Sequence, residues 1–226
     1  MLCIIQARYS SKRLPGKVLK KILGVTVLKR VINQVKKSKK ISKIIVATSK
    51  HYSDKEIINF CNKNKIYCLS GPLNNVFKRF HSIITHEHCK SFARISADSP
   101  LLDPSLIDEA VTLFNKTQSD IVTNVFPRTF PKGFSVEVIN SQIISDFVLK
   151  IKTKKNKEHL TSFFYDNYKK FKIKNFYNKI NYSNINLSID NLSDFIRVKN
   201  IIKFCKNKNY GLNYTLLIYK KLFNEK

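Results

Sequence analysis

The first 125 residues alternate short apolar runs with longer stretches whose apolar residues recur at helical spacing. The short runs have the length of buried strands and lie at residues 2–6, 43–48, 66–69, 92–96 and 120–123. The longer stretches are expected as amphipathic helices, at residues 25–37, 54–64, 75–88 and 104–116, and Asp54 is expected to cap the second of them. Strands and helices in this order predict an α/β fold with a mostly parallel sheet flanked by helices. Such sheets bind ligands outside the carboxyl ends of their strands.

The second half of the chain is less regular. Residues 134–139 alternate apolar and polar side chains, as an edge or antiparallel strand does, and residues 171–176 alternate apolar and basic ones. A further short strand is expected at residues 187–189, and helices at residues 141–151, 156–168, 192–205 and 214–223. No internal repeat or linker divides the chain, so we expect one domain over residues 1–226.

The chain is strongly basic, with 42 Lys and Arg against 15 Asp and Glu and a net charge of +27. Such a surface could hold nucleic acid, an anionic membrane or phosphorylated substrates. The lysines are nevertheless spread over many segments, and the chain is rich in Lys, Asn and Ile but has only 5 Gly and no Trp. A dedicated nucleic-acid binder concentrates Arg at its contacts and shows a recognisable module. We therefore favour biased composition and expect no specific nucleic-acid partner.

The five cysteines form neither a CxxC pair nor a Cys/His array with zinc spacing. The apolar run at the N-terminus is too short for a secretory signal, and no stretch approaches 18 apolar residues. These features predict reduced thiols, a cytoplasmic location and no transmembrane segment.

A basic loop follows the first expected strand, with the sequence QARYSSKRLPGK at residues 6–17. It carries four cations, Arg8, Lys12, Arg13 and Lys17, beside two serines and a Pro-Gly turn. Arg offers forked donors and Lys a point charge, a combination that suits a polyphosphate. The loop is neither a Walker A loop nor a GxGxxG fingerprint. A solvated basic turn is the alternative, but the position at the binding edge of the sheet favours an anion site.

Two acidic residues follow expected strands in this acid-poor chain. Asp98 follows the strand at residues 92–96 and Asp190 the strand at residues 187–189, whereas Asp103 is expected to cap a helix. Mg²⁺ takes one or two protein carboxylates and completes its shell with water and substrate phosphate. Asp98 is the better candidate ligand. Asp190 alone could equally cap the helix at residues 192–205, but paired with Asp98 it becomes a plausible second ligand.

Several of these segments carry a family resemblance. IIQARYSSKRLPGKVL, SGPLNNVFKRF, RISADSPLLDPSLID, PRTFPKGFSVEV and LSIDNLSDF occur in this order, and IIVATS and EHLT agree with them. The chain thus resembles the cytidylyltransferases related to spore coat polysaccharide biosynthesis protein F, which are relatives of the CMP-sialic acid and CMP-KDO synthetases. The resemblance implies a nucleotide-diphospho-sugar transferase fold with a small antiparallel insertion, an acceptor-side and dimerisation element at about residues 126–182, and a homodimer. It also implies Mg²⁺-dependent transfer of CMP from CTP to a sugar, with release of pyrophosphate, and the acceptor we expect is a 2-keto sugar acid for surface polysaccharide or glycan synthesis.

The resemblance also assigns roles to residues. It implies that Arg8 and Lys17 contact the triphosphate and that Asp98 and Asp190 hold Mg²⁺. Residues implied to line the nucleotide are Ala7, Arg13, Ala47, Thr48, Ser70 and Gly71, and those on the acceptor side are Arg128, Lys132, Glu137, Glu158 and His159. The chain departs from the family at Tyr9, where relatives usually carry an aliphatic residue, and at Ser135, where many carry Asp. Acceptor choice is therefore left open.

Two other functions compete with this interpretation. A glycosyltransferase of the related fold would hold its metal with a DxD motif, but the residue two beyond Asp98 is Pro100. A basic nucleic-acid binder would leave the ordered arrangement of the basic loop, Asp98 and Asp190 unexplained. No general base is evident, and His159 is more readily interpreted as a residue that positions the substrate than as a base.

Overall fold

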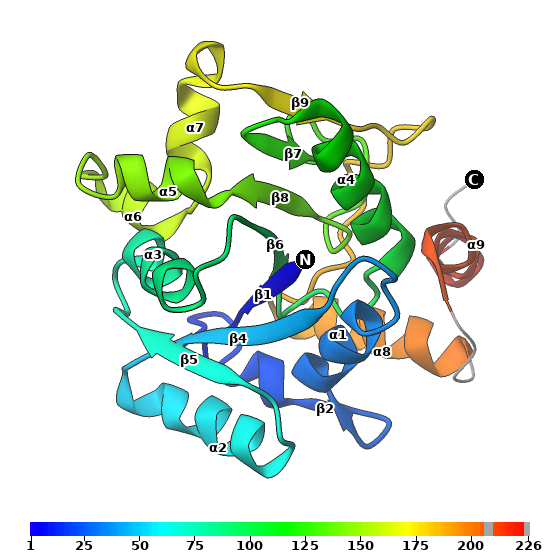
Figure 1. Cartoon of the computed structure of the whole chain (residues 1–226). Coiled ribbons are helices and arrows are strands. Elements are labelled where there is room, and N and C mark those ends of the chain that lie inside the picture. Colours follow the sequence, from blue (N-terminus) through cyan, green and yellow to red (C-terminus); the bar gives the residue numbers. More distant parts are fainter. Residues whose placement is uncertain (206–209, 224–226) are drawn as a thin grey trace.

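The chain is built around a seven-stranded sheet with the order β5-β4-β1-β6-β8-β7-β9 (Figure 1). The computed structural model describes residues 1–205 and 210–223. The strands of the sheet are β1 (Leu2–Gln6), β4 (Lys43–Ser49), β5 (Cys68–Gly71), β6 (Ser91–Ser96), β7 (Ile121–Thr123), β8 (Glu137–Asn140) and β9 (Ile173–Asn175). β8 runs antiparallel to β6 and β7, and the other neighbouring pairs are parallel. The predicted mostly parallel sheet is therefore confirmed.

The register of the central strands decides where the site lies. Gln6 at the end of β1 is opposite Ala47 of β4 on one side and Ser96 of β6 on the other. These strands therefore end at the same level. The segments that follow them meet at one edge of the sheet.

Helices cover both faces of the sheet (Figure 1). The α-helices are α1 (Val27–Val35), α2 (Lys55–Lys63), α3 (Val76–His86), α4 (Pro104–Thr117), α5 (Ser141–Phe147), α6 (Lys154–Glu158), α7 (Ser162–Asp166), α8 (Leu192–Phe204) and α9 (Leu212–Phe223). Short 3-10 turns lie at η1 (Lys17–Leu19), η2 (Tyr52–Asp54) and η3 (Tyr168–Lys170), and β2 (Lys21–Ile22) pairs with β3 (Val25–Thr26) in a small antiparallel sheet.

The alternation of side chains along β1 shows how the core is divided. Cys3 and Ile5 pack into one cluster with residues of α1, α2, α4, α8 and α9, whereas Leu2 and Ile4 pack into a second cluster with α3, α5 and α7. Successive residues of a strand point to opposite faces, so a strand buried on both sides is apolar throughout. This is why the apolar runs predicted the central strands well.

Two predictions from the second half of the chain are wrong. The helix expected at residues 156–168 is broken into α6 and α7, because His159 adopts an extended backbone and turns the chain. Residues 187–189 do not form a strand of the sheet. Instead, the amide of Leu187 donates to the carbonyl of Lys132 and that of Ile189 to the carbonyl of Asp98, which binds the segment to two loops.

Helix caps account for several helix starts. Asp103 caps α4 by accepting from the amide of Ser105 at 2.9 Å, as predicted. Asn191 caps α8 in a reciprocal capping box with Asp194. Asp54 stands at the start of α2, but its side chain makes no cap hydrogen bond, contrary to expectation.

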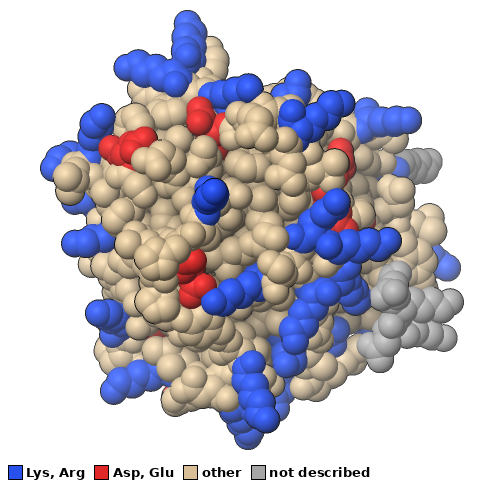
Figure 2. Space-filling view, viewed as in Figure 1, with Lys and Arg blue, Asp and Glu red and all other residues tan. Residues whose placement is uncertain are grey.

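Figure 2 shows Lys and Arg scattered over the visible face rather than gathered in a single patch. This distribution agrees with the compositional interpretation of the net charge of +27. Within the described residues, no helix combines the length and the apolar character needed to cross a membrane.

Candidate active site

A cleft of about 550 Å³ lies at the carboxyl ends of β1 and β6. It contains most of the charged residues that the sequence singled out. Its lining includes Arg8, Lys12, Arg13, Lys17, Asp98, Glu158, His159 and Asp190. Segments that are far apart in the chain therefore converge on one site.

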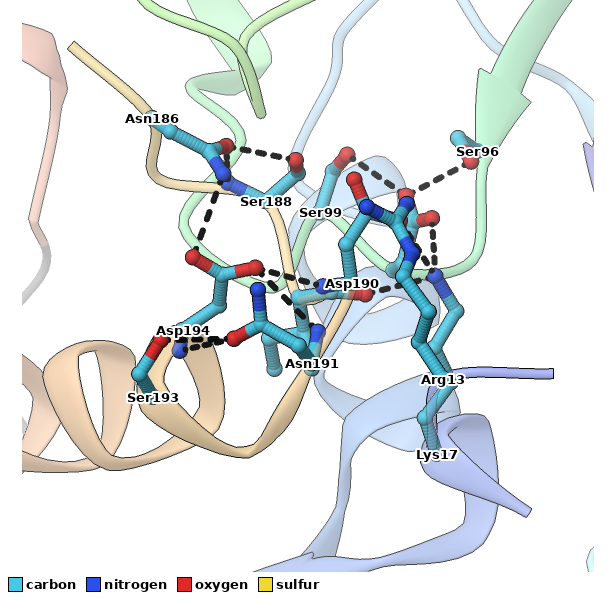
Figure 3. A network of polar contacts seen from close by, with 12 residues as sticks. Arg13, Lys17, Ser96, Ser99, Asn186, Ser188, Asp190, Asn191, Ser193 and Asp194 are labelled. Carbon is cyan, nitrogen blue, oxygen red and sulfur yellow. Dashed lines mark hydrogen bonds and ion pairs between the residues drawn. The ribbon is translucent and has the colours of Figure 1, made fainter. Parts of the chain in front are cut away.

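Lys17 lies at the centre of the charged network in this cleft (Figure 3). Its Nζ donates to Asp98 Oδ2 at 2.8 Å, to Asp190 Oδ1 at 3.0 Å and to the carbonyl of Ile189 at 2.6 Å. The side chain is only 9% exposed, so this charge is largely shielded from water. An ammonium has three donors, and here each of them meets an acceptor.

Asp98 is fixed from two sides. Its Oδ1 accepts hydrogen bonds from the hydroxyls of Ser96 at 2.7 Å and Ser99 at 3.3 Å, which leaves Oδ2 directed at Lys17. Its backbone carbonyl accepts from the amide of Ile189 at 2.9 Å. That bond brings the segment carrying Asp190 beside Asp98.

Asp190 is not a helix cap, which decides the alternative that the sequence left open. The cap of α8 is Asn191, and Asp194 Oδ2 accepts from the amide of Asp190 at 3.1 Å. The carboxylate of Asp190 is thereby free to face Lys17 and Arg13, the latter at 3.3 Å (Figure 3). Burial would raise the pKa of Asp190, but the hydrogen bond from Lys17 and the charges of Lys17, Arg13 and Lys132 hold it below its ordinary value.

The two aspartates fit a magnesium ion that arrives with a phosphate. One oxygen of each lies within 3.0 Å of the same ammonium nitrogen, so both can approach a single cation. Carboxylate oxygens are the hard ligands that Mg²⁺ prefers. In the described part of the chain, no group of three or more His, Cys, Asp or Glu side chains could hold a metal. Two carboxylates are what Mg²⁺ uses where substrate phosphates supply further oxygens.

Arg8 and Arg13 are held more loosely than Lys17. Arg8 pairs with Glu158 at 3.3 Å, and these side chains are 52% and 42% exposed. Arg13 is 66% exposed. Exposed pairs contribute at most about 1 kcal/mol, so both guanidinium groups can turn toward an anion at little cost.

The other residues implied to line the nucleotide lie outside this cleft. Ala7 donates its amide to the carbonyl of Ala47 at 2.9 Å, and Thr48 donates its hydroxyl to Asp54. Ser70 and Gly71 end β5, the outermost parallel strand beside β4. All lie near the carboxyl ends of β1, β4 and β5, at the same edge of the sheet as the cleft, and their contact with a base or ribose stays a prediction.

Arg79 is a residue that the sequence reasoning missed. It is 2% exposed, and its guanidinium donates to the carbonyls of Pro72 at 2.7 Å and Leu73 at 3.2 Å. A Cβ added to Gly71 would lie 2.8 Å from Arg79 Cγ, so the glycine allows this approach. Arg79 thus shapes the loop after β5. The signal in the sequence was an arginine beside Phe80 on the apolar face of α3.

A second, smaller cavity of about 220 Å³ adjoins the cleft, with which it shares Ser96 and His159. It is lined by Arg94, Ser96, Val125, Arg128, Ser135, Glu137, His159, Leu160, Thr161 and Tyr165. Arg128 donates to Ser135 Oγ at 3.0 Å. Lys132 is exposed and is not among these lining residues, but its charge contributes to the low pKa of Asp190.

Glu137 lines the second cavity with its charge already paired. It is 3% exposed, forms an ion pair with Arg94 and accepts from the hydroxyls of Thr161 at 2.8 Å and Tyr165. Burial would raise the pKa of Glu137, but the charge of Arg94 and these hydrogen bonds hold it below its ordinary value. Its predicted contact with an acceptor stays a prediction, and its evident role is to anchor this wall.

Replacing this charge should change the response of the fold to acid. Because the folded-state pKa of Glu137 is lowered, its ionised form stabilises the protein above about pH 4.3, and this stabilisation disappears as pH falls through the folded-state value. Glu137→Gln should cost up to about 3 kcal/mol at pH 7, since Arg94 loses its ionised partner and keeps only the side-chain oxygen of Gln6. The free energy of unfolding of this variant should also fall less steeply than that of wild type as the pH is lowered.

Urea unfolding between pH 7 and pH 3 measures both effects, with exposed Glu56→Gln as the control. If the stability of Glu137→Gln and of wild type fell equally steeply as the pH is lowered, the folded-state pKa of Glu137 would not be lowered.

The sequence model of the cytidylyltransferase family matches residues 2–212. The chain belongs to this family. An uncharacterized protein of Methanocaldococcus jannaschii is 33% identical over 85% of this chain and 79% of its own length. The spore coat polysaccharide biosynthesis protein SpsF of Bacillus subtilis is 29% identical over 65% of this chain and 61% of its own length. The 3-deoxy-manno-octulosonate cytidylyltransferase of Chlamydia trachomatis is 29% identical over 58% of this chain and 52% of its own length.

Solved structures agree with the family assignment. A cytidylyltransferase from Leptospira borgpetersenii has a TM-score of 0.93 and 26% identity, over 98% of this chain and 94% of that one. A CMP-2-keto-3-deoxy-manno-octonic acid synthetase complexed with CTP has a TM-score of 0.69 and 12% identity, over 90% of this chain and 98% of that one. At that identity the second match shows the fold alone, which is that of the nucleotidyltransferases.

Proposed function

We propose that this cytidylyltransferase transfers CMP from CTP to a hydroxyl of a sugar, with release of pyrophosphate. The observation that carries the proposal is the placement of Lys17 against Asp98 and Asp190 in a 550 Å³ cleft. The adjoining 220 Å³ cavity would receive the acceptor. A 2-keto sugar acid is the favoured class, because the Chlamydia relative is named for such a sugar and Arg128 lines the cavity.

The reaction is an in-line displacement at the α-phosphorus of CTP. The acceptor hydroxyl releases its proton to solvent and its oxygen forms a bond to this phosphorus. The bond to the bridging oxygen of the β-phosphate breaks, and pyrophosphate leaves with that oxygen. Charge on the phosphate oxygens must be stabilised throughout, so positioning and fixed cations provide most of the catalysis. Lys17 would neutralise charge near the α-phosphate, and Arg8 would hold the departing pyrophosphate.

Asp98 and Asp190 would hold Mg²⁺ bound to the nucleotide. When bound, the ion neutralises phosphate charge and lowers the pKa of a coordinated hydroxyl. His159 lies where the cleft meets the acceptor cavity, which suits a residue that orients the acceptor hydroxyl.

Pyrophosphate release tests the proposal. The purified protein is incubated with CTP, Mg²⁺ and a panel of 2-keto sugar acids, with the corresponding neutral sugars as controls. We expect turnover with at least one acid and a rise in melting temperature with CTP that exceeds the rise with ATP or GTP. Absence of both turnover and a CTP-dependent shift would overturn the proposal. Transfer from a finished nucleotide-sugar without pyrophosphate formation would favour a glycosyltransferase instead.

We also propose a homodimer formed through the segment at residues 126–182. This segment exposes Tyr168 at 52%, Tyr177 at 58% and Ile180 at 60%, and it contains the edge strand β9. Burying these side chains and the open edge would stabilise an association. Light scattering should therefore give twice the chain mass at micromolar concentration, and a monomer there would contradict the dimer.

A further inference from the structure

Asp54 carries a buried carboxylate that neither the helix cap nor the proposed reaction uses. The residue is 0% exposed and, within residues 1–205 and 210–223, makes no ion pair. Its side chain makes no hydrogen bond to the amides at the start of α2, which it was expected to cap. A buried carboxylate without hydrogen-bond donors or an opposite charge destabilises the fold. The groups that donate to Asp54 therefore show which parts of the chain it holds together.

Four hydrogen bonds satisfy the carboxylate. Oδ2 accepts from Thr48 Oγ1 at 3.0 Å and from Ser49 through its amide at 2.9 Å and its hydroxyl at 2.5 Å. Oδ1 accepts from the amide of Tyr9 at 2.7 Å. Hydrogen bonds to an ionised acceptor are the strong ones. Asp54 therefore joins the end of β4 to the first residues of the basic loop.

Tyr9 in turn closes that loop. Its carbonyl accepts from the amides of Ser11 at 2.8 Å and Gly16 at 2.9 Å. Its ring covers Gly16 so closely that an added Cβ would lie 2.9 Å from Tyr9 Cζ, and the φ of 66° at Gly16 also favours glycine. Lys17 is the residue after Gly16, so the contacts of Tyr9 with Gly16 help to fix the position of the Lys17 ammonium in the cleft.

We propose that Asp54 is a positioning residue, which holds the basic loop in the conformation that places Lys17 and Arg8 for the triphosphate. The structural part of the proposal stands on the hydrogen bonds alone, and its consequence for CTP rests on the proposed function. In this chain the ring of Tyr9 also covers Gly16 within the closed loop.

The test compares Asp54→Asn with Asp108→Asn. An amide presents one acceptor oxygen and a donor, so it cannot accept from both Tyr9 and Ser49. Asp108 is a matched control, because its carboxylate also joins two segments, accepting from Ser38 Oγ at 2.5 Å and from the amides of Lys39 and Lys40 at 3.1 Å, and it does not line the cleft.

Hydrogen exchange gives a readout that does not depend on the reaction. In Asp54→Asn, the amides of Tyr9 and Gly16 should exchange about 10- to 100-fold faster than in wild type, the factor that corresponds to losing one hydrogen bond to a charged group. Asp108→Asn should leave them unchanged. Unchanged exchange in Asp54→Asn, or the same acceleration in both variants, would overturn the proposal.

Ligand kinetics provide the second readout. KM for CTP should rise about 10-fold or more in Asp54→Asn while KM for the acceptor stays near wild type. If KM for CTP and KM for the acceptor rose equally in Asp54→Asn, the residue would have a general structural role, and the positioning role would be overturned. If wild type neither binds nor turns over CTP, the proposed function fails, and the exchange comparison still tests the loop.

A measurement on the unaltered protein covers the case in which Asp54→Asn does not fold. The amide of Tyr9 should exchange at least about 10-fold more slowly than that of Lys12, which lies at the exposed tip of the same loop. Equal exchange rates at these two positions would overturn the proposal.

Discussion

Lys17→Met should lower kcat/KM by about 100- to 1000-fold, the range found when one group that stabilises transition-state charge is lost. Methionine approximates the length of the lysine stem but removes the ammonium that faces Asp98 and Asp190. Steady-state pyrophosphate release with CTP and a competent acceptor measures the loss. Lys17→Arg should not restore activity, because a planar guanidinium cannot replace a compact charge that meets three acceptors within 3.0 Å.

Lys20→Met is the matched control for this variant. Lys20 lies three residues further along, is exposed and does not line the cleft. It should retain activity within about twofold, since an exposed charge outside the cleft is largely screened by salt and water. Equal losses in Lys17→Met and Lys20→Met would show that overall charge, and not the position of Lys17, supports the reaction.

Asp98→Asn and Asp190→Asn should each lower kcat/KM by at least about 100-fold, the cost of losing one charge-stabilising group. An amide keeps the shape of the carboxylate but not the charge that attracts Mg²⁺. Each variant should also need more Mg²⁺ for half-maximal rate. A magnesium titration of the initial rate, together with Mn²⁺ binding in the presence of CTP, measures both effects.

Asp103→Asn controls for this pair. Asp103 belongs to the same ADSPLLD segment as Asp98 but caps α4, and asparagine caps helices equally well. Its magnesium dependence should match wild type. If instead Asp98→Asn and Asp190→Asn keep the wild-type magnesium dependence, these residues do not hold the ion.

Prediction from sequence succeeded where an element depends on its own residues. β1 and β4 are buried on both faces, so continuous apolar runs marked them, and Asp103 capped its helix through a local bond. The helix expected at residues 156–168 failed because tertiary contacts decide it. Its break at His159 brings Thr161 to Glu137, a residue 24 positions earlier.

The same distinction applies to the site. The meeting of Lys17 and Asp98 was predictable, because loops after the neighbouring strands β1 and β6 meet at one edge of the sheet. Asp190 joins them although residues 187–189 form no strand, because the amide of Ile189 donates to the carbonyl of Asp98. Asp54 and Arg79 were not, since each acts through hydrogen bonds made in the buried interior. Sequence suggested a helix cap for Asp54, but the carboxylate instead joins β4 to the basic loop, 45 residues away.

Anomalous diffraction from crystals of the protein with CTP and Mn²⁺ tests the central claim most directly. We expect one manganese peak in contact with the carboxylates of both Asp98 and Asp190, with the triphosphate in the cleft and the ammonium of Lys17 turned toward a phosphate oxygen. A triphosphate bound outside this cleft, or manganese that contacts neither aspartate, would contradict the account.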